Sequence, residues 1–253
     1  MYKIPQAAID QETLDRLSRV QIESSWAALR EINSGFRDNV ISGLKCLRPD
    51  KKMVGLARTQ RWLPMRPDLG EAVAEWARNS GEIESLQFRA AESTKPGEVM
   101  VIDSGGPKPH ACWTGDIIVE GFIVNGGIGY VTDGTVRDLS AMLKMDIPMY
   151  IGGAHPGDNI NNVGMEMNIP IRCGGVSVVP GDVLVGDVEC VLVIPSIHAE
   201  KVSKRAAETD HLEEFYRDLI RSKRFSLQRV YGEKDPEVQD IYEEYKAENP
   251  VQY

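Results

Sequence analysis

The chain has 253 residues, of which 42% are hydrophobic and 26% charged, so it can bury a sizeable core. Its formal net charge of −9 opposes a phosphate backbone, and Lys and Arg are scattered, so we expect no nucleic-acid partner. The acidic, amphipathic start is unlike a signal peptide, and no stretch approaches about 18 apolar residues. We expect a cytoplasmic protein with no membrane partner, whose four widely spaced cysteines remain thiols.

The first segment alternates charged and apolar positions at helical spacing. Its apolar positions between residues 8 and 32 are Leu14, Leu17, Val20, Ile22, Trp26 and Leu29. This pattern predicts an N-terminal helical segment within residues 1–40.

The middle of the chain predicts an α/β core, because short β-rich runs alternate with Gly/Pro turns and a few helical patches. The expected strands are 53–59, 98–103, 128–133, 147–153, 168–173, 182–187 and 190–195. The expected helices are 70–79, a run that begins at about Gly115-Asp116, and 138–145.

The last zone is charged and amphipathic. It predicts a long helix over 197–225 and another over 237–249. We expect a single domain with a core at about 53–195, and the C-terminal helices at 197–253 form an arm of the kind that oligomers use.

The candidate chemistry lies where a helix and a strand are expected to meet. Asp116 precedes an apolar-periodic run, so we expect it to cap a helix whose free N–H groups favour a carboxylate or an enolate. The strand 128–133 and a turn at Asp133-Gly134 would deliver Arg137 and Asp138 to the start of the next helix. If the strand and helix pack side by side, Asp116 and the Arg137-Asp138 pair converge at one end of the sheet.

Asp116, twenty intervening residues and Arg137-Asp138 form an acidic-x20-Arg-Asp signature. Further motifs are GLART at 55–59, CWTGD at 112–116, GGIGYVTDGTVRD at 126–138 and CGGVSVVPGDVLVGDVECVLVIP at 173–195. On these motifs the chain resembles the RraA-like class II pyruvate aldolases. This family includes 4-hydroxy-4-methyl-2-oxoglutarate and 4-carboxy-4-hydroxy-2-oxoadipate aldolases, oxaloacetate decarboxylases and regulators of ribonuclease activity. The resemblance implies an α/β fold, a swivelling β/β/α domain with added N- and C-terminal helices here, assembled as a homotrimer or a homohexamer.

The resemblance also implies roles for three side chains. Asp138 matches the aspartate that ligates Mg²⁺ or Mn²⁺, with water in most other positions. Arg137 matches the arginine that contacts the keto oxygen and carboxylate of a small 2-oxo acid, where its planar fork suits an enolate. Asp116 matches the carboxylate that orients water on the metal.

Two further features follow from the same resemblance. The pyruvyl carboxylate would be held by the backbone of Thr114, Gly115, Asp116 and Ile117. Members of the family also use a glutamate from a neighbouring subunit's C-terminal helix, and the matching residue is Glu213 or Glu214.

These roles predict a divalent-metal-dependent lyase that cleaves a carbon–carbon bond of a 4-hydroxy-2-oxo acid to release pyruvate, and that also decarboxylates oxaloacetate. The alternative is a non-catalytic regulator that binds a ribonuclease or another protein, although the retained signature counts against it. Lys144 is expected to be exposed, which disfavours an imine route. His110 and Cys112 could form a thiol–imidazole couple, but no oxyanion partner is evident. The Asn/Met-rich segment 152–175 is expected to shape the pocket for the leaving half of the substrate.

Overall fold

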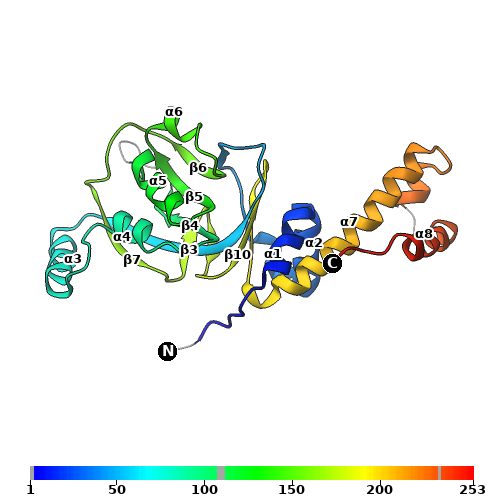
Figure 1. Cartoon of the computed structure of the whole chain (residues 1–253), viewed down its shortest axis with the longest axis horizontal. Coiled ribbons are helices and arrows are strands. Elements are labelled where there is room, and N and C mark those ends of the chain that lie inside the picture. The colour runs from blue at the N-terminus through cyan, green and yellow to red at the C-terminus, as the bar shows by residue number, and fades with distance from the viewer. Residues whose placement is uncertain (1–2, 107–111, 233–234) are drawn as a thin grey trace. The chain divides into compact units, whose positions relative to one another are not determined.

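The computed structural model describes residues 3–106, 112–232 and 235–253, and it divides into two compact units (Figure 1). The first unit holds the chain up to Ala8 and the long central segment Phe36–Ile197. The second unit combines Ile9–Gly35 with His198–Tyr253. The expected core and the expected terminal helices therefore fall largely into different units.

The first unit is built around a mixed sheet. Its strands among the described residues are β1 (Val40–Ile41), β2 (Lys45–Cys46), β3 (Met53–Pro64), β4 (Glu98–Asp103), β5 (Gly129–Val136), β6 (Met149–Ala154), β7 (Asn162–Met167), β10 (Val183–Gly186) and β11 (Val191–Ile194). The order across the sheet is β1-β11-β10-β3-β4-β5-β6-β2, and β7 pairs with β3 beyond this path. The central pairs β3–β4, β4–β5 and β5–β6 are parallel, and the other pairs are antiparallel.

Alternate side chains of the central strands pack into two separate hydrophobic cores. On β4, Met100 and Ile102 pack into one hydrophobic cluster, whereas Val99 and Val101 pack into the other. Successive side chains of a strand point to opposite faces, and both faces of this sheet are covered. The sequence of each central strand is therefore a nearly continuous apolar run.

Helices cover one face of the sheet and a small β-hairpin packs against the other, as expected for a β/β/α arrangement. The helices of this unit are α3 (Pro67–Ser80), α4 (Leu86–Glu92), α5 (Asp116–Val124) and α6 (Leu139–Met142). Buried residues of α4 and α5 join the cluster that contains Met100, and the two helices pack together. The hairpin of β8 (Ile171–Cys173) and β9 (Val176–Val178) joins the cluster that contains Val101.

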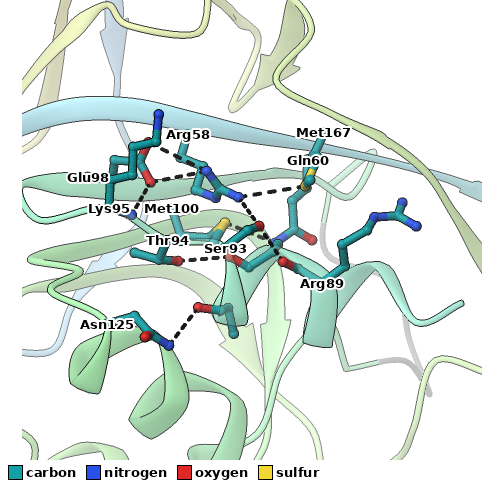
Figure 2. A network of polar contacts seen from close by, with 12 residues as sticks. Arg58, Gln60, Arg89, Ser93, Thr94, Lys95, Glu98, Met100, Asn125 and Met167 are labelled. Carbon is teal, nitrogen blue, oxygen red and sulfur yellow. Dashed lines mark hydrogen bonds and ion pairs between the residues drawn. The ribbon is translucent and has the colours of Figure 1, made fainter. Parts of the chain in front are cut away.

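A buried polar network fixes α4 against the sheet (Figure 2). Arg58 of β3 is only 3% exposed, and its Nη1 lies 3.1 Å from Oε2 of Glu98 at the start of β4. Its Nη2 donates to the Ser93 hydroxyl just after α4, and Glu98 accepts a 2.8 Å hydrogen bond from the Lys95 backbone N–H. One guanidinium thus ties together β3, the end of α4 and the turn into β4.

The expected turn at Asp133-Gly134 is wrong, because β5 continues through these residues to Val136. The register against β6 shifts between Thr132 and Thr135, which is how the strand absorbs the irregular stretch. Gly134 is required by a close approach, since a Cβ there would lie 1.9 Å from the Trp113 ring. Asp133 is buried and accepts backbone hydrogen bonds from Ser104 and Gly174.

The second unit is helical. Its helices are α1 (Gln11–Arg19), α2 (Ile22–Ile32), α7 (Ala199–Arg221) and α8 (Pro236–Glu248), and a short helical turn, η3, spans Gln228–Gly232. Two further short turns, η1 (Ser34–Asp38) and η2 (Ser196–His198), lie where the chain passes between the two units. Both α1 and α2 pack on α7. Farther along α7, Phe215 and Leu219 form an apolar cluster with Val238 and Tyr242 of α8. The expected terminal helices are therefore present, with α7 ending four residues earlier than the pattern predicted.

Candidate active site

The site is built where the loop ahead of α5 pairs with the end of β5. The Trp113 N–H donates to the Thr135 carbonyl at 2.8 Å, and the Arg137 N–H donates to the Thr114 carbonyl at 3.0 Å. These two bonds extend the β5 ladder by a short stretch of loop. They bring the start of α5 next to the Arg137-Asp138 pair, as the sequence predicted.

Arg137 and Asp138 leave the sheet with an unusual backbone turn. Asp138 has φ of 58°, in the left-handed region, which aspartate tolerates better than most residues. Its Oδ2 lies 3.3 Å from Arg137 Nε and 3.5 Å from the backbone nitrogen of Asp116. The Arg137 and Asp138 side chains are 47% and 41% exposed, so both remain open to a ligand.

Gly115 allows this close approach. A Cβ at this position would lie 2.8 Å from Asp138 Oδ2 and 2.9 Å from Arg137 Nε. Any side chain would therefore displace the ion pair. The glycine of the CWTGD motif is explained by the need to bring the backbone against these two functional groups.

Asp116 does not cap α5 as expected. Gly115 is the residue ahead of the helix, and Asp116 is the first helical residue, with its Oδ1 accepting from the Ile117 N–H at 2.8 Å. An acidic residue in the first turn is still favoured by the partial positive charge at a helix N-terminus. The Asp116 side chain therefore stays at the site without satisfying the usual capping hydrogen bond.

A cavity of about 280 Å³ lies beside these residues. Its lining consists of Gln87, Phe88, Cys112, Thr114, Gly115, Asp116, Ile117, Ile118, Arg137, Asp158 and Asn159. The sequence-predicted substrate residues Thr114 to Ile117 and Arg137 are thus brought together around one hollow. Sequence reasoning missed Gln87 and Phe88 of α4, for which no local signal exists.

The carboxylates at the site suit a hard divalent cation. Among the described residues, no group of three or more His, Cys, Asp and Glu side chains could hold a metal ion. Asp138 is half-exposed next to the start of α5, where Asp116 adds a second carboxylate. Mg²⁺ is commonly bound through one or two carboxylates while it keeps several waters. The donor set fits such a weakly liganded cation and does not fit a zinc-type cage.

The other candidate nucleophiles are poorly placed. Cys112 is 5% exposed, and burial raises the pKa of its thiol, which disfavours the reactive thiolate. Its suggested partner His110 lies outside the described residues. Lys144 is exposed in the turn after α6, as expected, so it is not desolvated as an imine-forming lysine must be.

Glu213 and Glu214 lie on α7 in the second unit. Each carboxylate is 3.0 Å from an Arg217 guanidinium nitrogen, and Glu214 also lies 3.1 Å from Arg221. Their role toward a neighbouring subunit remains a prediction.

Among the described residues, no helix combines the length and apolar character needed to cross a bilayer.

Comparison with known proteins defines the class of this protein. Residues 27–193 match the family described as "RraA-like: Aldolase/RraA". A protein of Halalkalibacterium halodurans named "Putative 4-hydroxy-4-methyl-2-oxoglutarate aldolase" is 30% identical over 200 residues, which cover 76% of this chain and 85% of that protein. A protein of the same name from Alcanivorax borkumensis is 33% identical over 99 residues, covering 39% of this chain and 61% of that one.

Solved structures agree with this assignment. The crystal structure of Streptomyces coelicolor RraAS2, titled an unusual member of the RNase ES inhibitor RraA protein family, is 29% identical with a TM-score of 0.70. The match covers 84% of this chain and 99% of that one. The crystal structure of an uncharacterized Pseudomonas syringae protein is 22% identical, with a TM-score of 0.71, and shares the fold. That match covers 88% of this chain and 98% of the Pseudomonas syringae chain. The chain belongs to the aldolase/RraA family, and the expected RraA-like α/β fold is confirmed.

Proposed function

We propose that the protein is a divalent-metal-dependent lyase that cleaves the C3–C4 bond of a 4-hydroxy-2-oxo acid to release pyruvate. The observation that carries this proposal is the meeting of Arg137, Asp138 and Asp116 beside one small cavity at the start of α5. The aldolase names of the relatives support a lyase.

In this proposal Asp138 would hold Mg²⁺ or Mn²⁺, and the cation would supply Lewis-acid stabilisation of the negative charge that develops on the substrate. Arg137 binds the keto oxygen and the carboxylate of the pyruvyl end with its planar fork. The positive end of the α5 dipole favours the same carboxylate, and a direct bond from the Ile117 N–H would replace the 2.8 Å bond that this group donates to Asp116 Oδ1. Each group faces charge that grows as the bond breaks, which is the condition for lowering the barrier.

Asp116 is the proposed base. It takes the proton of the 4-hydroxyl, directly or through one water, as the C3–C4 bond breaks and its electron pair passes into the pyruvate enolate. The enolate then takes up a proton at C3. Oxaloacetate would lose CO₂ through the same enolate, so we also propose decarboxylase activity.

A direct test is pyruvate release from oxaloacetate and from 4-hydroxy-4-methyl-2-oxoglutarate, followed by lactate dehydrogenase and NADH. We expect turnover with Mg²⁺ or Mn²⁺ and its loss when EDTA is added. Metal-independent turnover would contradict the proposed role of the cation. Absence of pyruvate from both substrates with either metal would contradict the enzyme itself.

The second candidate is a regulator that binds a ribonuclease or another protein. The similarity to Streptomyces coelicolor RraAS2, a member of the RNase ES inhibitor RraA protein family, favours this candidate. A regulator has no evident use for Arg137 and Asp138 beside a cavity. Inactivity in the pyruvate assay, together with inhibition of a ribonuclease by the purified protein, would favour it.

We also propose that the chain assembles as a homotrimer or homohexamer, with Glu213 or Glu214 reaching a neighbour's site. Support comes from large apolar side chains at and near the cavity: Phe88, Ile117 and Ile160 are 52%, 77% and 70% exposed. Such a group of exposed apolar side chains is typical of an interaction surface.

A further inference from the structure

A second hollow, of about 560 Å³, lies between α3, α4 and β7. Its lining includes Val73, Trp76, Arg89, Met165, Met167 and Ile169. It shares no lining residue with the catalytic cavity among the described residues, although α4 contributes to both. Small-molecule sites commonly have volumes of about 300–1,000 Å³. The hollow therefore has the size of a ligand site, and the proposed chemistry gives it no role.

The apolar side of α3 is only partly covered by protein. Within this helix, which is described throughout its length, Ala77 is the buried residue. Val73 and Trp76 lie on the same side at helical spacing, yet Val73 is only half-buried and Trp76 is 44% exposed. From β7, Met165 and Met167 point to the same face of the strand, line the hollow and are half-buried. A ligand with an apolar body would remove these side chains from water.

Arg89 of α4 places one guanidinium group in this hollow. It lies over the Trp76 ring, 4.5 Å from the ring centroid, and its Nη1 donates to the Ile83 carbonyl at 3.0 Å. The side chain extends away from the network around Arg58 (Figure 2). Burial lowers the pKa of Arg89, and the Glu82 carboxylate opposes this shift. Among the described residues no carboxylate forms an ion pair with Arg89, so its fork can still accept a ligand carboxylate.

The charges of the lining favour a ligand with one carboxylate. Among the described lining residues, Arg89 is the cation, and Glu82 and Glu166 are carboxylates. Both glutamates are exposed, so water and salt screen their charge, whereas Arg89 is half-buried. A carboxylate on Arg89 would form two parallel hydrogen bonds with the guanidinium. A second anionic group would find no further cation in the lining and would lie nearer the glutamates.

We propose that this hollow is a second ligand site, which binds a small molecule with one carboxylate and a flat apolar body. Arg89 pairs with the carboxylate, and Trp76, Met165 and Met167 pack against the body. Methionine suits this role, because its flexible thioether adapts to an aromatic ring and makes favourable contacts with it. The inference does not rest on the proposed lyase activity, since these residues take no part in that chemistry.

The test uses indole-3-acetate as the probe and indole-3-acetamide as its uncharged counterpart, each titrated into the full chain by calorimetry. We expect indole-3-acetate to bind with a Kd of about 1 mM or tighter, and the amide to bind at least about tenfold more weakly. Arg89→Met should weaken binding of the acid about tenfold and leave binding of the amide nearly unchanged. Arg89→Lys should restore part of the loss, and Trp76→Ala should weaken binding of both compounds.

Arg78→Met is the matched control, because Arg78 is an exposed arginine of α3 that does not line the hollow. Arg137→Ala tests the guanidinium of the catalytic cavity as a competing site for the probe. Both variants should bind indole-3-acetate as the parent does, and melting temperatures establish that each variant is folded. Equal binding of acid and amide by the parent, or no binding of the acid, overturns the inference. Parent-like binding of the acid by Arg89→Met, or its loss in Arg137→Ala alone, also overturns it.

Discussion

At the scale of single residues, Arg137 and Asp138 are neighbours in the chain with separable roles. We expect Asp138→Ala to lose Mn²⁺ binding and turnover together, because the carboxylate is the proposed metal ligand. Arg137→Ala should keep metal affinity but lose about 10²–10³-fold in rate, the usual cost of removing one donor to developing charge. Arg137→Lys should recover little, because an ammonium lacks the planar fork. Isothermal titration with Mn²⁺ and kcat measurements separate the two effects.

Asp146→Asn is a suitable control for these variants, since Asp146 is 79% exposed and pairs with Arg48 and Lys51 away from the cavity. Parent-like Mn²⁺ binding by Asp138→Ala would show that this carboxylate is not the ligand. Full turnover by Arg137→Ala would show that Arg137 and Asp138 form only a surface ion pair, which contributes little to stability.

At the scale of elements, the Arg58 network determines how firmly α4 is held against the sheet (Figure 2). We expect Glu98→Ala to lower the free energy of unfolding by about 3 kcal/mol, because it leaves the guanidinium buried without its counter-ion. Replacing both Arg58 and Glu98 with methionine should recover part of this loss. Urea unfolding of the two variants measures the difference.

The exposed pair Arg78–Glu71, at 62% and 69%, provides the comparison for this experiment. Glu71→Ala should leave the unfolding midpoint at the parent value, because solvent screens exposed ion pairs. If Glu98→Ala also left the unfolding midpoint at the parent value, the network would not hold α4 in place.

The turn into β10 contains a carboxyl group whose titration should be visible in stability. Burial raises the pKa of Asp182 to about 6, although the carboxylate accepts a 2.8 Å hydrogen bond from the Val179 N–H. Between about pH 4 and pH 6 the folded state holds a proton that the unfolded state has released. The contribution of Asp182 to the free energy of unfolding therefore falls as the pH rises through that window and stays low at higher pH.

Asp182→Asn removes the charge and keeps an acceptor for Val179. We expect the variant to be more stable than the parent at pH 7, by at most about 3 kcal/mol. The two proteins should differ least near pH 4. Thermal unfolding at a series of pH values measures this, and parallel curves for parent and variant would contradict the raised pKa.

At the scale of the whole molecule, the family match ends at residue 193, before the long helix α7. Light scattering behind size-exclusion chromatography should give three or six times the 28.1 kDa mass of one chain. Ile160→Glu should weaken the assembly by placing a charge on an exposed apolar position, whereas Val188→Glu, away from the cavity, should not. A 28.1 kDa parent would contradict both the assembly and the shared glutamate.

Local pattern and motif spacing determined much of this protein. Continuous apolar runs identified β4 and the first half of β5, because a strand buried on both faces has no polar side. The acidic-x20-Arg-Asp spacing placed Asp116 near Arg137-Asp138, since the end of a strand and the start of a packed helix meet at one edge of the sheet.

Only the tertiary structure decided the rest. Asp133-Gly134 has the composition of a turn, but pairing with β6 and the Trp113 ring keep these residues in the strand. Gln87 and Phe88 of α4 reach the cavity through packing between segments that are distant in sequence. Local pattern reports the conformation that each segment prefers, whereas the walls of a cavity depend on which segments pack together, and that depends on side-chain contacts across the whole core.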